Sequence, residues 1–233
     1  MPGPILEQAA LFGHAEPIGF GDDSFRVELI GYTAAAAIIE ANHYSGTSVS
    51  YATENFGVFI GGQRVGALQW GYAMNPASGP RVVSGSTLHG WRELNRMWLD
   101  DAAPRNSESR AISYCLKWFR IARRDVEWVQ SFADERCGGL GVVYQACSFL
   151  YVGEHTAVFW ELDGKMYHNV GATCKDEARL SSRPGWRYLQ DNLDRATPHK
   201  LRQFRYFRAL TRRARRNLLL EPQPYPKPEA PSA

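Results

Sequence analysis

The sequence predicts an α/β protein in which helices flank a mixed β-sheet. Two successive strand–loop–helix units lead to this prediction: apolar runs over 91–99 and 128–134 each precede a segment with helical apolar spacing. One hairpin pattern lies before the first unit and another follows the second. Strands that alternate with helices in this way are typical of a mixed sheet covered by helices.

Within the second unit, the spacing of the apolar residues changes from that of a buried strand to that of a helix. The run over 128–133 predicts a buried strand that ends at Asp134, and apolar residues from Val142 to Leu150 recur at helical spacing. The glycine-rich turn Arg136–Gly141 joins the two halves and would aim backbone N–H groups at an anion or a reacting oxygen. A tight connection without a ligand is the simpler interpretation of the same glycines.

The other elements each rest on a local pattern, while the chain before Asp23 predicts no definite element. In chain order we expect a strand from Ser24, a helix over Ala34–Ala41 capped by Thr33, a hairpin over Asn55–Ala67 turning at Gly61–Gly62, a loop over Tyr72–Val83, a central strand over Trp91–Leu99, a helix with Ile112, Cys115, Leu116 and Phe119 inward, a hairpin over Thr156–Tyr167 turning at Asp163–Gly164, and a final helix over 197–218.

Length and composition bound the class of protein. A chain of 233 residues with 44% hydrophobic content predicts one domain over residues 1–218, followed by a disordered, proline-rich tail over 219–233. Apolar runs stay well short of the roughly 20 residues that a membrane span needs, and the N-terminal segment lacks a secretory pattern, so we expect a cytoplasmic protein. The four cysteines, without CxxC spacing, are expected to be buried free thiols.

The final helix is expected to bind DNA. The segment between Lys200 and Arg216 contains no acidic residue, and a run of cations without acids favours phosphate contacts over a merely solvated face. The candidate DNA-binding residues are Lys200, Arg202, Arg205, Arg208, Arg212, Arg213, Arg215 and Arg216.

Several blocks of the sequence carry a family resemblance. They are Asn42–Ser45, Phe56–Val58, Glu93–Trp98, Pro104–Arg110, Ser131–Asp134 and Tyr144–Ala146. Over residues 30–171 the chain resembles the Mom family of Mu-like phages, and its element order resembles the GNAT acyltransferase fold, a mixed sheet that splays to admit a coenzyme A thioester. The resemblance implies an enzyme of the host cytoplasm that adds a carbamoylmethyl group to the N6 amine of adenine in double-stranded phage DNA and so blocks host restriction.

The resemblance also implies where a donor molecule binds. In GNAT proteins the loop after the central strand holds the pyrophosphate of coenzyme A with glycines, but here Glu108 and Arg110 occupy the glycine positions. A carboxylate and a bulky side chain would disfavour a pyrophosphate, so ordinary acetyl-coenzyme A binding is in doubt. The residues expected to bind a donor of unknown identity are Arg96, Arg105, Ser107, Ser109 and Arg110.

The chemistry on adenine needs a deprotonated amine and an activated electrophile. We expect Asp134 to act as a general base or ligand, His43 and Tyr44 to join it from the loop after the first helix, and Ser109 to position the donor. By resemblance, Tyr144 is the general acid toward the leaving thiolate. His43, Tyr44 and Asp134 are also a hard-ligand set for iron, and the resemblance implies that metal.

Two other functions are compatible with the sequence. A conventional GNAT N-acyltransferase would use acetyl-coenzyme A on a small amine or a protein. A non-catalytic DNA-binding protein would keep the fold and the basic segment alone. The sequence leaves the oligomeric state open, including a homodimer.

Overall fold

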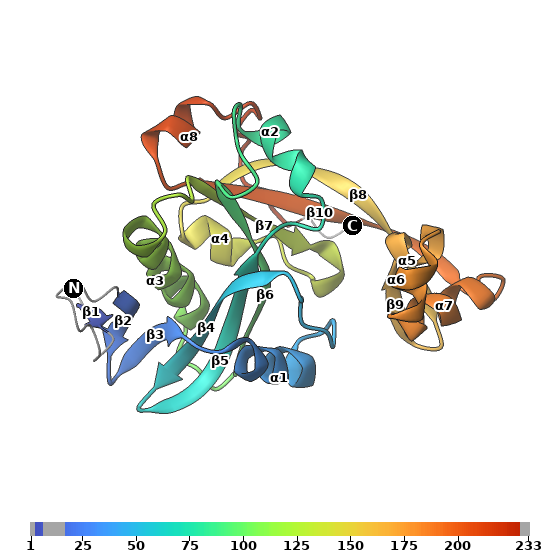
Figure 1. Cartoon of the computed structure of the whole chain (residues 1–233), viewed down its shortest axis with the longest axis horizontal. Helices are drawn as coiled ribbons and strands as arrows, with labels where there is room; N and C mark the ends of the chain where they lie inside the picture. Colours follow the sequence, from blue (N-terminus) through green and yellow to red (C-terminus); the bar gives the residue numbers. More distant parts are fainter. Residues whose placement is uncertain (1–2, 7–16, 229–233) are drawn as a thin grey trace.

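The structure is a computed structural model, and it describes residues 3–6 and 17–228. Within these residues the strands form one ten-stranded sheet in the order β1-β2-β3-β4-β5-β6-β7-β10-β8-β9 (Figure 1). The strands are β1 Pro4–Leu6, β2 Pro17–Asp22, β3 Phe25–Leu29, β4 Ala52–Ile60, β5 Gln63–Gly71, β6 Trp91–Leu99, β7 Trp128–Asp134, β8 Leu150–Leu162, β9 Lys165–His168 and β10 Thr197–Ala209. The mixed α/β class expected from the sequence is confirmed.

Helices cover both faces of this sheet. They are α1 Tyr32–Asn42, α2 Gly79–Val82, α3 Ser107–Ala122, α4 Val142–Ala146, α5 Asn169–Thr173, α6 Glu177–Ser181, α7 Pro184–Asp191 and α8 Arg212–Arg216, with short 3₁₀ turns at Pro76–Ser78 and Glu135–Cys137. Leu68 belongs to the core cluster that includes the buried face of α3, whereas its neighbour Ala67 packs with α1. Because successive strand residues face opposite sides, α3 and α1 lie on opposite faces of the sheet.

Most local predictions are confirmed. The β4–β5 hairpin turns at Gly61–Gly62, the β8–β9 hairpin turns at Asp163–Gly164, and the central strand covers Trp91–Leu99 as expected. The four inward residues expected on the helix after β6 are all buried on α3. Three boundaries differ: β1 and β2 lie before Asp23, a short helix α2 lies in the expected loop, and α1 begins at Tyr32 with Gly31, not Thr33, at its N-cap.

The helix expected after the glycine turn is shorter than its apolar spacing suggested. Helix α4 ends at Ala146, Ser148 takes a left-handed backbone conformation with φ of 56°, and β8 begins at Leu150. Phe149 is still buried, but in the connection rather than on a helix face. A short apolar run fits both a helix and a buried strand, and the sheet decides between them.

The prediction of a basic C-terminal helix over 197–218 is wrong. Residues Thr197–Ala209 form strand β10, which pairs with β7 on one side and β8 on the other, and only Arg212–Arg216 are helical. Apolar residues at Phe204, Tyr206 and Phe207 fit either period, and two neighbouring strands supply hydrogen bonds that outweigh local helix propensity.

The segment after residue 218 contacts the domain, contrary to the disorder expected for 219–233. Gln223 pairs with Tyr151 through a backbone hydrogen bond of 2.9 Å, and the Tyr225 hydroxyl donates to the Phe149 carbonyl at 2.7 Å. A proline-rich segment can still pack when its few N–H groups and aromatic rings find partners. Residues 229–233 lie outside the described residues.

The thiols are more varied than expected. All four cysteines are free, and Cys115 and Cys147 are buried, but Cys137 is exposed and Cys174 is half-buried. Helix α3, the longest helix among the described residues, is far too polar to cross a membrane, and none of the other helices described qualifies either.

Candidate active site

Strands β6 and β7 run parallel and then separate. They pair only from Trp91 with Trp128 to Glu93 with Gln130, and β6 carries one extra residue at Asn95 where its register with β5 shifts. Past Gln130, Ser131 reaches across by donating to the Leu94 carbonyl at 3.2 Å. Beyond Glu93 and Gln130 the β6–β7 ladder is therefore interrupted in the middle of the sheet, and we call this separation the splay.

Asp134, His43 and Tyr44 lie together on one side of the splay, as the sequence analysis expected. The residue that joins them is Arg136, which the sequence analysis did not select. Its guanidinium pairs with Asp134 Oδ2 at 3.0 Å and lies 4.8 Å from the centroid of the Tyr44 ring. The rings of His43 and Tyr44 are 4.1 Å apart, and Tyr44 is 59% exposed, so this cluster faces outward.

His43 is a neutral group in this cluster. Burial, together with the charges of Arg96 and Arg136, lowers its pKa from 6.5 to about 4. Its Nδ1 lies 3.1 Å from the Ser45 backbone N–H, which donates to it, and 2.8 Å from Ser45 Oγ. A ring held at Nδ1 and uncharged at neutral pH can take part in hydrogen bonding through Nε2.

Tyr144 lies on the opposite face of β7. Ser131 and Tyr206 face each other across the β7–β10 ladder, and the Tyr144 ring packs 5.3 Å from that of Tyr206, whereas Asp134 points to the other face. Burial raises the pKa of Tyr144 to about 12, so its phenol keeps its proton at neutral pH. Tyr144 and Asp134 therefore lie on opposite faces of β7.

The candidate donor residues line a pocket of about 310 Å³ at the N-terminus of α3. Arg105, Ser107, Ser109 and Arg110 all belong to its lining. Ser107 Oγ and Ser109 Oγ donate to the carbonyls of Pro104 and Asn106, at 2.6 and 3.0 Å, and so hold the loop rather than point freely.

The side chains at the two glycine positions behave differently in this pocket. Arg110 lines it and stacks over the Phe25 ring, with 4.2 Å from its guanidinium carbon to the ring centroid. Glu108 is absent from the lining, so its carboxylate does not face the pocket. A cation held flat over an aromatic ring can contact an anionic or planar group of a donor.

Arg96 is separate from this pocket. It lies on β6 at the splay and donates to two backbone carbonyls, from Nε to Thr47 at 3.0 Å and from Nη1 to Asn95 at 2.7 Å. It thereby ties the loop after α1 to the central strand. Four of the five residues expected to bind the donor molecule therefore line the pocket, and the fifth, Arg96, lies at the splay.

Glu93, one of the polar residues that interrupt the apolar run of strand β6, is a further candidate site residue. It accepts hydrogen bonds from Gln130 Nε2 at 2.7 Å and Asn95 Nδ2 at 3.2 Å, and burial raises its pKa. The side-chain amide oxygens of Asn95 and Gln130 are buried without a hydrogen-bond partner. A carboxyl flanked by two free acceptors at the start of the splay suits a ligand that donates hydrogen bonds.

His43, Tyr44 and Asp134 do not fit an iron site. Asp134 accepts from the Arg136 backbone nitrogen and Nη2, each at 3.0 Å, so the guanidinium charge of Arg136 would lie beside any cation bound to this carboxylate. The guanidinium charges of Arg96 and Arg136 act on His43 and would repel a cation. Within residues 3–6 and 17–228, no three His, Cys, Asp or Glu side chains form a group that could hold a metal ion. We derive no step through iron.

The eight basic residues expected to bind DNA form two groups instead of one helix face. Lys200, Arg202, Arg205 and Arg208 lie on β10, and Arg212, Arg213, Arg215 and Arg216 lie in α8. Two of them have acidic partners from elsewhere in the chain, at 2.7 Å for Arg202 with Glu135 and 2.5 Å for Arg213 with Glu127. Acids distant in sequence therefore neutralise part of the run.

The polar cluster at the end of β7 and the pocket at the N-terminus of α3 belong to a transferase-type enzyme, as the comparison with known proteins shows. The chain belongs to the Mom protein family, which residues 24–227 match. It is 51% identical over 215 residues to the methylcarbamoylase mom of Escherichia phage Mu, covering 90% of this chain and 87% of that protein.

Solved acetyltransferase structures resemble the fold at low sequence identity. The ribosomal-protein-S5-alanine acetyltransferase from Vibrio fischeri is 10% identical with a TM-score of 0.48, covering 84% of this chain and 98% of its own. A ribosomal L7/L12 α-N-protein acetyltransferase is 11% identical with a TM-score of 0.45, covering 84% and 97%.

Proposed function

We propose that this protein transfers a carbamoylmethyl group to the N6 amine of adenine in double-stranded phage DNA and thereby protects that DNA from restriction in the host cytoplasm. The observation that carries the proposal is the splay, which presents Asp134, His43 and Tyr44 on one side and Tyr144 on the other. The 51% identity to a methylcarbamoylase supports the same chemistry.

The reaction follows from these positions. A flipped adenine enters from the side of Asp134, and its N6 nitrogen attacks the methylene carbon of an activated carbamoylmethyl donor. The N6–carbon bond forms as the bond from that carbon to the leaving group breaks. Asp134 accepts the proton from N6, because each of its oxygens keeps a lone pair beyond those used by Arg136. Tyr144 donates a proton to the leaving group.

The other residues position these groups. Arg136 orients Asp134, and the neutral His43, whose Nδ1 accepts from the Ser45 backbone N–H, can donate a hydrogen bond from Nε2 without adding positive charge. The pocket around Ser109 and Arg110 holds the donor, and Arg96 keeps the loop that carries His43 against the splay. We place a donor other than acetyl-coenzyme A in this pocket, because Arg110 occupies a position where a glycine would admit a pyrophosphate.

Nucleoside mass spectrometry of plasmid DNA from expressing cells tests the proposal. We expect a modified adenosine whose mass exceeds that of deoxyadenosine by one carbamoylmethyl group in place of a hydrogen. An unchanged adenosine pool with abundant folded protein would refute the reaction. Acetylated amines in the same cells would favour the conventional acyltransferase, and DNA binding alone would favour the non-catalytic alternative.

A further inference from the structure

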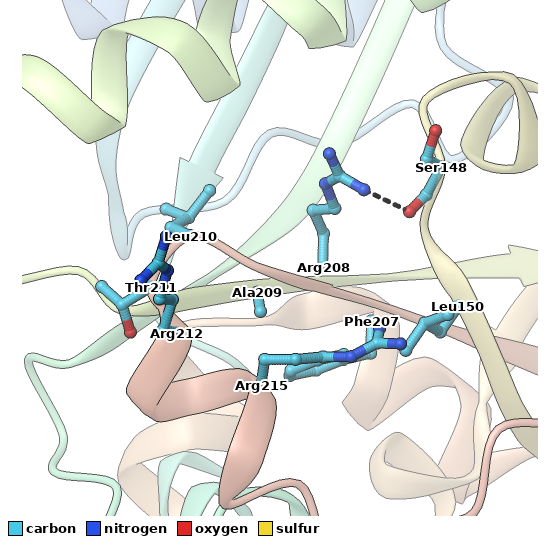
Figure 2. Close-up of a pocket in the computed structure, with 9 residues that line it drawn as sticks. All are labelled: Ser148, Leu150, Phe207, Arg208, Ala209, Leu210, Thr211, Arg212 and Arg215. Atoms are coloured by element: carbon cyan, nitrogen blue, oxygen red, sulfur yellow. Dashed lines mark hydrogen bonds between the residues drawn. The ribbon is translucent and has the colours of Figure 1, made fainter.

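A second pocket lies far from the splay, where β10 ends and β8 begins. It has a volume of about 290 Å³, and its lining includes Ser148, Phe207, Arg208, Arg212 and Arg215 (Figure 2). Arg208 pairs with Val129 on β7, whereas Asp134 pairs with Gln203. At the usual rise per strand residue, the pocket is about 17 Å along β7 from Asp134.

The charges of this pocket are unbalanced. Arg208 reaches the Ser148 carbonyl with Nη1 at 2.6 Å, a contact drawn in Figure 2, but its Nε is buried and has no partner. In the described part of the chain, neither Arg208 nor Arg212 nor Arg215 forms an ion pair with an acid. The charge of Arg208 also contributes, after burial, to a lowered pKa of Arg120 on α3. Three arginines therefore line one hollow whose lining contains no acidic side chain.

This arrangement differs from that of the neighbouring arginine. Arg213, in the same helix, pairs with Glu127 at 2.5 Å and so has a structural role. In Figure 2 the side chain of Arg215 extends along Phe207 toward Leu150, which leaves its guanidinium at the pocket. Guanidinium groups that line one pocket are stabilised by a ligand with negative charge and several acceptor oxygens, and a phosphate is such a ligand.

We propose that this pocket binds one phosphate of the DNA backbone on the flank of the modified adenine. The inference rests on the proposed function, since it assumes that DNA is the substrate. A distance of about 17 Å corresponds to about five base-pair steps along the duplex axis, so a duplex whose adenine enters the splay is long enough to reach the pocket. Phosphate binding here fixes the position of the duplex and carries no base specificity.

The double variant Arg212→Gln/Arg215→Gln tests the pocket, and the charge-matched control replaces Arg64 and Arg124 by Gln, which also removes two positive charges. Arg212 and Arg215 are exposed in α8, whereas the exposed Arg64 and Arg124 are outside the pocket lining. Fluorescence anisotropy with a 24-base-pair duplex is measured over a range of salt concentrations. We expect about tenfold weaker binding for the double variant and a salt slope smaller by about 1 for each lost phosphate contact, with less than a twofold change for the control.

Other outcomes distinguish a DNA phosphate from the phosphate of a small molecule. They also distinguish failure of the pocket proposal from failure of the proposed function. Equal weakening in the double variant and the control would overturn the pocket, because it would show a diffuse charge effect. Unchanged DNA affinity, with weaker binding of inorganic pyrophosphate by calorimetry, would also overturn it in favour of a phosphate-bearing small molecule. If the wild-type protein modified no adenine, the proposed function would fail, while the anisotropy comparison would still decide the pocket.

Discussion

Arg136 holds the carboxylate of Asp134 by two contacts, one from its backbone nitrogen and one from its guanidinium, each at 3.0 Å. The same guanidinium lies over the ring of Tyr44. One arginine thus links the end of β7 to the loop after α1, and the predictions for the site follow from this link.

Asp134→Asn is expected to reduce adenine modification by at least about 100-fold, because the amide cannot accept the amine proton. The side chain is isosteric, but its single amide oxygen can accept from only one of the two Arg136 donors, so a modest loss of thermal stability is expected. Mass spectrometry of nucleosides and thermal unfolding measure the two effects. The control is Asp125→Asn, which removes a carboxylate that pairs with Arg123 at 2.8 Å but lies outside the site. Undiminished modification in Asp134→Asn would remove this residue from the chemistry.

The imidazole of His43 is expected to titrate with a pKa of about 4. A histidine pKa below its unfolded value means that stability falls as pH drops from about 6.5 toward about 4, because only the unfolded state binds the proton readily. Proton NMR of the imidazole follows the titration. Arg136→Gln should raise the midpoint, since one of the depressing charges is lost, although burial keeps it below 6.5. A midpoint near 6.5 in the wild-type protein would contradict the cluster.

Glu93→Gln is expected to stabilise the protein at pH 8 by a few degrees in Tm. The pKa of Glu93 is raised by burial, so the wild-type protein loses stability as pH rises through that pKa, and the variant does not. The advantage should shrink at pH 4, where wild-type Glu93 is protonated. Calorimetry at the two pH values measures it, and Glu28→Gln, at a half-buried ion pair with Arg26, is the comparison. An advantage independent of pH would contradict this assignment.

Tyr225→Phe is expected to cost about 1 kcal/mol of unfolding free energy, because the Phe149 carbonyl loses its donor. Removal of residues 219–233 should cost more, since the Gln223–Tyr151 pairing is lost too. Urea unfolding compares the two variants with the full chain. Equal stability of all three proteins would show that the segment contributes nothing to the fold.

Local patterns carried enough information for the central elements. The polar and apolar order of 91–99, the helical spacing behind it and the Gly61–Gly62 and Asp163–Gly164 turns depend on residues near one another in sequence, so β6, α3 and both hairpins were predicted. His43 and Tyr44 follow the first helix and Asp134 ends its strand, whereas Tyr144 lies within α4 and was selected by the family resemblance. Their selection needed no tertiary information.

Tertiary structure decided what depends on distant partners. Residues 197–209 became a strand because β7 and β8 flank them, although their local sequence fits a helix. The pairing of Arg213 with Glu127, the docking of Tyr225 and the pocket around Arg208 join residues far apart in the chain. The sequence by itself determined which groups can carry the chemistry. Only the sheet decided that Asp134 and Tyr144 lie on opposite faces of β7, because the strand sets the direction of each side chain.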